Sequence, residues 1–196
     1  MDLLEWLQHP YPVTLVRWLL GTTFLVAATS KFVDRSRFAQ TILAYDVLPR
    51  RLAYIFARWL PWIEGVIGLT LVLGLVTKAT AVLGSVLLFS FTVAIAINLA
   101  RGRTHLDCGC FGLGDRQQIS AKVLIRNILL VTLSFYVAAC ANGYFELGSL
   151  LFGGRIQSTD RPPIEGLLGI TIISIGALML YLLGKQLTVL IRRYRT

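Results

Sequence analysis

The chain has 196 residues, of which 56% are hydrophobic and only 15% are charged. A soluble domain carries about 25% charged residues, so this composition excludes a soluble globular protein and predicts an integral membrane protein. The 19 Lys and Arg residues outnumber the 10 Asp and Glu residues. Nucleic-acid binding is not expected, because no basic stripe with interleaved aromatic residues is present.

Apolar runs long enough to cross a membrane recur along the chain, since a spanning helix needs about 20 apolar residues. The N-terminus lacks the Lys and Arg residues of a cleavable signal peptide, so the first span should be retained. We expect an all-α, polytopic membrane helical bundle that forms one domain over residues 1–196 in contact with membrane lipid. Its spans are predicted at about 12–30, 52–76, 79–100, 121–141 and 164–183.

The residues around the connections between the first three spans also predict local structure. The polar segment of about residues 31–51 is expected to hold a short interfacial helix, and Lys31 at its start should snorkel to the interface. Pro61 should kink the second span. Only Thr77 and Lys78 separate this span from the third, which predicts a tight hairpin.

The loop after the third span contains two cysteines, Cys108 and Cys110, with Gly109 between them. Glycine permits backbone angles that other residues resist, so the two sulfurs can come close. They are suited to disulfide exchange, metal binding or a structural role. Nearby cations stabilise a reactive thiolate, and this loop is rich in Arg, so the sequence favours a redox pair. A disulfide closed over one residue should be strained and comparatively oxidising.

Several polar side chains are predicted at the same membrane face as this pair. A charge inside a span costs about 2.5 to 3.5 kcal/mol on insertion scales, so Arg58, Glu64 and Arg126 should face the bundle interior and shape the surroundings of the thiols. Arg58 and Glu64 are six residues apart, so Glu64 should meet another span. The other supporting candidates are Lys31, Asn98, His105 and Asp107.

Metal binding is a weaker alternative for the cysteine loop. His105, Cys108 and Cys110 lack the fourth ligand that zinc sites have. Copper(I) accepts two or three thiolate and imidazole ligands, but no metal or other cofactor is predicted. Cys140 lies about 27 Å along the fourth span from the loop, so it is expected to be a packing residue rather than a resolving thiol.

The end of the third span and the following loop read Asn98-Leu-Ala-Arg101-Gly-Arg-x-x-x-Asp107-Cys108-Gly-Cys110-Phe-Gly112. This motif resembles the signature of the MauE family of methylamine-utilisation membrane proteins. The first two spans contain Arg17-x-x-x-Gly21-x-x-Phe24-x-x-Ala27-x-x-x-Lys31 and Leu60-Pro61-x-x-Glu64-x-x-x-Gly68. These patterns are similar to the broader DoxX-like membrane group, whose four-helix core would be followed here by a fifth C-terminal span.

The resemblance implies a membrane thiol-disulfide redox protein that supports maturation of an exported disulfide-containing protein, as in methylamine dehydrogenase biogenesis. The implied partners are a thioredoxin-like, MauD-like protein and the exported client, with Cys108 and Cys110 as the exchange pair. A single close pair needs a separate electron acceptor, for which a quinone is one candidate. Whether the chain is itself an enzyme, a thiol-disulfide oxidoreductase, stays open. The alternatives are a non-enzymatic assembly factor or scaffold and a small metal-handling or transport protein.

The loops differ in their content of Lys and Arg. With the N-terminus outside, the first loop, the cysteine loop and the C-terminal tail carry five, four and four of these residues, against three in the outer loops. The positive-inside rule then predicts a bacterial cytoplasmic membrane protein with its N-terminus outside and its C-terminus inside. The same count places the cysteine loop in the cytoplasm, whereas an exported client would lie outside.

Overall fold

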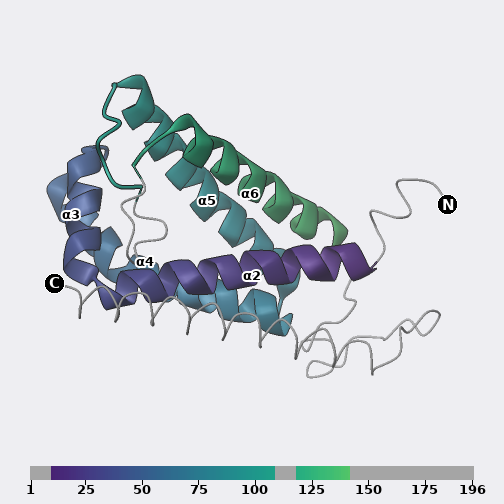
Figure 1. Ribbon diagram of the computed structural model, residues 1–196. Helices are drawn as coiled ribbons and strands as arrows, with labels where there is room; N and C mark the ends of the chain where they lie inside the picture. The colour runs from purple at the N-terminus through teal and green to yellow at the C-terminus, as the bar shows by residue number, and fades with distance from the viewer. Residues whose placement is uncertain (1–9, 109–117, 142–196) are drawn as a thin grey trace, which may run out of the picture. The chain divides into compact units, whose positions relative to one another are not determined.

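The computed structural model describes residues 10–108 and 118–141 (Figure 1). In this part of the chain four helices are long and apolar enough to cross a membrane. They are α2 (Pro10–Val33), α4 (Arg50–Leu73), α5 (Thr77–Ala100) and α6 (Ala121–Cys140). The prediction of an all-α polytopic membrane protein is confirmed, and the predicted fifth span at 164–183 lies outside the described residues.

The short helix expected between the first two spans is present as α3 (Arg35–Tyr45). Asp34 caps it, because its side chain accepts a hydrogen bond from the Arg37 backbone N–H at 3.1 Å. This helix holds Arg37 near its start and Tyr45 at its end, and both residues contact the cysteine loop.

The hairpin between the second and third spans forms, but its turn comes earlier than predicted. Helix α4 runs through Pro61 and ends at Leu73. Gly74 caps it, because its left-handed backbone (φ 69°) lets its N–H bond the carbonyls of the last turn. Residues 74–76 therefore make the turn, and Thr77 and Lys78, predicted as the connection, already belong to α5.

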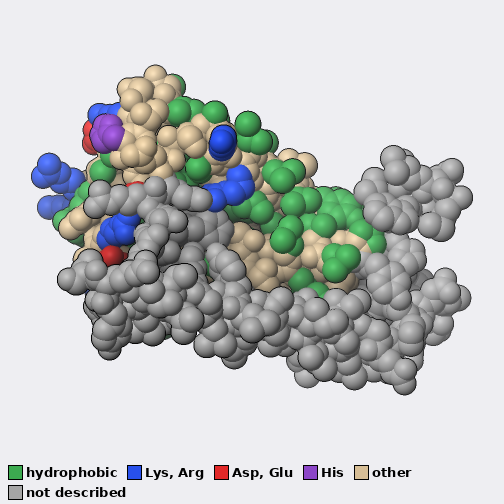
Figure 2. All heavy atoms as spheres, viewed as in Figure 1, with side chains coloured by type: hydrophobic (Ala, Val, Ile, Leu, Met, Phe, Trp, Pro, Cys, Tyr) green, Lys and Arg blue, Asp and Glu red, His purple; other side chains and the backbone are tan. Residues whose placement is uncertain are grey.

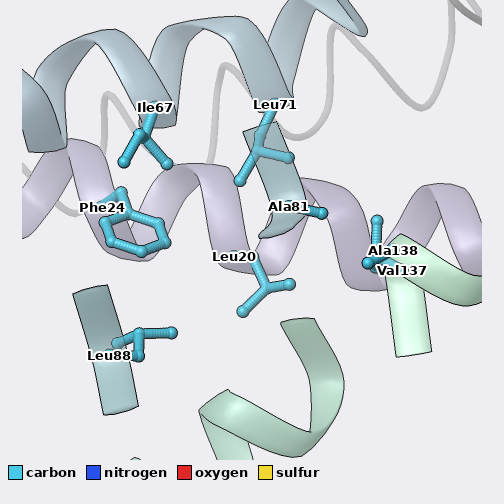
Figure 3. Packing of buried hydrophobic residues seen from close by; sticks show 8 residues of the cluster. All are labelled: Leu20, Phe24, Ile67, Leu71, Ala81, Leu88, Val137 and Ala138. Carbon is cyan, nitrogen blue, oxygen red and sulfur yellow. The ribbon is translucent and has the colours of Figure 1, made fainter. Parts of the chain in front are cut away.

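The long helices associate chiefly as two pairs, α2 with α4 and α5 with α6. Both pairs are antiparallel, and Figure 1 shows α5 and α6 side by side. Side chains from all four helices meet in one hydrophobic cluster (Figure 3), which consists of Leu20, Phe24, Ile67, Leu71, Ala81, Leu88, Val137 and Ala138.

Glycines allow α2 and α4 to approach closely. A Cβ atom at Gly21 would lie 2.7 Å from Val72 Cγ2, and one at Gly68 would lie 2.9 Å from the carbonyl oxygen of Gly21. Small residues at such contacts are common where membrane helices pack backbone to backbone. This contact fixes the register of the pair, and the same register places Lys31 opposite Glu64.

The outer surface is consistent with a lipid environment. Helix α4 exposes Trp59, Trp62 and Val66, which in lipid need no polar cover. On the face that Figure 2 shows, Lys and Arg side chains lie over α3 and the start of α6. The described ends of the cysteine loop lie at this same end of the bundle (Figure 1).

We predict that Gly68→Ala lowers the free energy of unfolding by about 1–3 kcal/mol, because the new methyl group overpacks the α2–α4 contact. Gly65→Ala is the matched control, since its Cβ would lie 3.8 Å from Ala28 Cβ, an ordinary contact. That variant should be neutral or more stable by up to about 1 kcal/mol through helix propensity. Unfolding in mixed detergent and dodecyl sulfate micelles measures both, and equal destabilisation of the two variants would contradict the prediction.

Candidate functional site

The cysteine loop leaves α5 after Ala100 and returns at Ala121, and its two described ends pair with each other. The Ile119 N–H donates to the Leu106 carbonyl oxygen at 2.9 Å, and Asp107 and Gln118 form an isolated antiparallel bridge. The chain therefore enters and leaves the loop side by side, with Cys108 directly after the bridge. Of the predicted pair, Cys108 is placed, and Cys110 lies outside the described residues.

Cys108 is buried, with 5% of its surface exposed. It belongs to a second hydrophobic cluster, which we call the cysteine cluster and which consists of Tyr45, Ile95, Cys108, Ile119 and Val123. These residues come from α3, α5, α6 and the loop itself. Their packing shields the Cys108 sulfur from direct approach by another protein.

Helix α3 holds the loop at two successive residues. The Tyr45 hydroxyl donates to the Cys108 carbonyl oxygen at 3.1 Å, in a buried contact. The Arg37 Nη2 group lies 2.8 Å from Asp107 Oδ2 in a half-buried ion pair. Because these contacts tie the backbone of Cys108 and the side chain before it to one rigid helix, the position of the thiol depends on α3.

Arg126 is the charged group that the structure places at the thiol. Its Nη2 donates to the Cys108 Sγ at 4.0 Å, from a half-buried position in the second turn of α6. A guanidinium at this place stabilises a thiolate over a thiol. This contact agrees with the expectation that Arg126 lies toward the same membrane face as Cys108.

Lys31 and Glu64 form an ion pair inside the bundle. The Lys31 Nζ lies 2.8 Å and 2.7 Å from the two carboxylate oxygens of Glu64, and each side chain is 3% exposed. The ammonium also lies over the rings of Phe38 and Phe91, at 5.2 Å and 5.8 Å from their centroids. The expectation that Glu64 meets another span is confirmed. The interpretation of Lys31 as a snorkelling residue is wrong, because a partner in α4 holds it inside.

The remaining candidates have different surroundings. Arg58 is exposed, so the expectation that it faces the bundle interior is wrong. It lies about 12 Å along α4 from the helix start, near enough for its long side chain to reach the interface. His105 is also exposed, whereas Asn98 is fully buried and donates from Nδ2 to the Ala94 carbonyl at 3.0 Å.

Sequence reasoning missed Arg37, Phe38 and Tyr45. A signal was available, because Phe38 and Tyr45 are seven residues apart and so share one face of the predicted interfacial helix. Both are buried in the structure, Phe38 near Lys31 and Tyr45 against Cys108. One face of α3 thus connects the buried ion pair with the cysteine cluster.

Cys140 is the last residue of α6, whereas Cys108 packs with Val123 in the first turn of that helix. A separation of 17 helical residues corresponds to about 26 Å. The prediction that Cys140 is no resolving thiol for Cys108 agrees with this distance. Within residues 10–108 and 118–141, no group of three His, Cys, Asp or Glu side chains is arranged to hold a metal ion.

The chain is similar to known proteins over most of its length. A family model described as methylamine utilisation protein MauE matches residues 9–140. The chain is 34% identical to the methylamine utilization protein MauE of Paracoccus denitrificans, covering 68% of this chain and 72% of that protein. It is 37% identical to the protein of the same name from Methylorubrum extorquens, covering 72% and 78%. No solved structure matches it.

We predict that Glu64→Gln lowers the free energy of unfolding by about 3–5 kcal/mol, because it leaves the Lys31 ammonium buried without a counter-charge. Replacing both residues, as Lys31→Met with Glu64→Leu, should recover most of this loss. Arg103→Gln is the control, since its ion pair with Asp46 is long, at 3.9 Å, and largely exposed, and should matter by about 0–1 kcal/mol. Unfolding titrations in micelles measure these differences, and a double variant as unstable as Glu64→Gln would contradict the account.

Proposed function

Since the chain belongs to the MauE family, we propose that it acts in methylamine utilisation as a membrane thiol-disulfide exchange protein. Its task in this proposal is to support the maturation of an exported protein that contains disulfides. The observation that carries the proposal is the position of Cys108, buried against Tyr45 and within 4.0 Å of the Arg126 guanidinium.

The burial of Cys108 divides the work between the two cysteines. A partner protein cannot reach the enclosed Cys108 sulfur, so the thiol of Cys110 is the one that exchanges with the partner. When a partner thiolate attacks the Cys110 sulfur of the oxidised pair, the Cys108–Cys110 bond breaks and a mixed disulfide forms. Cys108 leaves as a thiolate, which Arg126 stabilises, and a more stable leaving thiolate departs faster.

A second thiolate of the partner then attacks the mixed disulfide and releases Cys110. The partner gains one disulfide, and the two cysteines of this chain are left reduced. The pair must pass two electrons onward before another cycle. We assign this step to a thioredoxin-like, MauD-like protein or to a quinone in the membrane, and the reverse sequence would instead reduce a partner disulfide.

The test uses trapping of the mixed disulfide in a Cys140→Ala background. We predict that Cys108→Ser accumulates a mixed disulfide through Cys110, because the Cys110 thiolate can still attack a partner disulfide while Cys108, which resolves the mixed disulfide in this reverse direction, is gone. Cys110→Ser should accumulate none. Non-reducing electrophoresis with mass spectrometry identifies the linked cysteines. Trapping through Cys108 alone would overturn the division of roles. Full client maturation by the variant that lacks both thiols would exclude exchange and favour a scaffold.

The side of the membrane on which the cysteine loop lies decides which compartment holds its exchange partner. The charge count supports a cytoplasmic cysteine loop in a bacterial inner membrane, with the N-terminus outside and the C-terminus inside. We predict that a membrane-impermeant maleimide labels reduced Cys110 in permeabilised cells and not in intact cells, in the Cys140→Ala background. Equal labelling in intact cells would place the loop outside.

A further inference from the structure

The outer side of α4 carries one stripe of side chains that changes from basic to apolar along the helix. Arg58, Trp62 and Val66 follow one another at intervals of four residues, and all three are exposed. Residues three or four apart share a helix face, and the exposed residues Leu69 and Leu73 continue this one. The stripe has a cation at the end near α3 and aliphatic side chains farther along, which is the order of groups in a phospholipid.

A second arginine approaches this stripe from the first turn of α3. The Arg35 guanidinium carbon lies over the Phe32 ring, 5.1 Å from its centroid. The Phe32 ring in turn meets the Trp62 ring edge-on, with the two centroids 4.9 Å apart. Helix α2 ends just after Phe32 and α4 begins before Trp62, so Arg35 and Arg58 both leave the chain on the α3 side of this aromatic contact.

Neither arginine is used to neutralise a carboxylate. Among residues 10–108 and 118–141, the ion pairs that form involve other cations. The carboxylate of Asp34, next to Arg35, accepts hydrogen bonds from the Ser36 hydroxyl and the Arg37 backbone N–H as it caps α3. A cation in the first turn of a helix gains nothing from the helix macrodipole. The charge of Arg35 therefore serves no interaction within its own helix.

We propose that Arg35, Arg58 and Trp62 bind an anionic phospholipid. Stacking on Phe32 uses the face of the Arg35 guanidinium and leaves the N–H groups at its edge, which suit phosphate oxygens. Arg58 binds the same headgroup from α4. The Trp62 indole lies where the headgroup joins the acyl chains, a level that tryptophan favours in membrane proteins, and one acyl chain lies along Val66. Two arginines select an anionic lipid, because the ammonium of a zwitterionic headgroup already offsets its phosphate. The site does not depend on thiol exchange.

The fluorescence of Trp62 tests this proposal, because brominated acyl chains quench a tryptophan that they contact. In the full chain, Trp6→Phe and Trp59→Phe leave Trp62 as the reporter, while Trp18 is buried and stays. In phosphatidylcholine nanodiscs, brominated phosphatidylglycerol should bind beside Trp62 at least about fivefold more strongly than brominated phosphatidylcholine. We call this preference the selectivity ratio.

Replacing both arginines, as Arg35→Gln with Arg58→Gln, should lower the selectivity ratio to about one. Arg50→Gln with Arg51→Gln is the matched control, since both residues are exposed and lie at least about 10 Å farther along α4 from Trp62 than Arg58 does. This control should keep the ratio. Quenching by brominated phosphatidylcholine should be equal in all variants, which shows that Trp62 stays exposed. A parent ratio near one, a ratio that survives the loss of Arg35 and Arg58, or an equal fall in both double variants would overturn the proposal.

Phe32→Leu tests the position of Arg35 separately. This variant keeps both charges and removes the ring on which the guanidinium lies. The selectivity ratio should fall about as far as in Arg35→Gln alone, because an arginine without its stacking partner is no longer held beside Trp62. A full ratio in Phe32→Leu would overturn the assignment of Arg35 to the site.

Discussion

The ion pair between Lys31 and Glu64 is the constraint that orders the described part of the bundle. Two opposite charges with 3% exposure can lie inside a membrane protein only if they meet. They meet because Gly21 and Gly68 let α2 and α4 approach until one register is possible. The interaction supplies specificity more than stability, since other registers of the same helices would leave both charges unpaired.

The cysteine loop depends on this arrangement through α3. Phe38 lies under the Lys31 ammonium at one end of α3, and Tyr45 bonds the Cys108 carbonyl at the other. The loop thus takes its position from a helix that is itself held over the ion pair. Arg126 approaches the same thiol from α6, so two independent elements define the surroundings of Cys108.

The sequence predicted what depends on local pattern and missed what depends on register. Apolar runs located α2, α4, α5 and α6, and the polar segment with scattered apolar residues located α3. The cost of a buried charge predicted that Glu64 meets another span. Its partner could not be chosen, because Lys31 near a helix end is equally suited to the interface until the α2–α4 register is known. The contact of Tyr45 with Cys108 joins residues 63 positions apart, and no local pattern encodes such a pairing.

The two residues of the ion pair are synthesised at different times. Lys31 leaves the ribosome 33 residues before Glu64, which corresponds to a few seconds at about 5–20 residues per second. During this interval α2 carries a cation without its counter-charge. Lys31 lies in the last turn of α2, so its side chain can extend to the lipid headgroup region before α4 inserts beside it. Pairing of α2 with α4 then brings the ammonium to the Glu64 carboxylate inside the bundle.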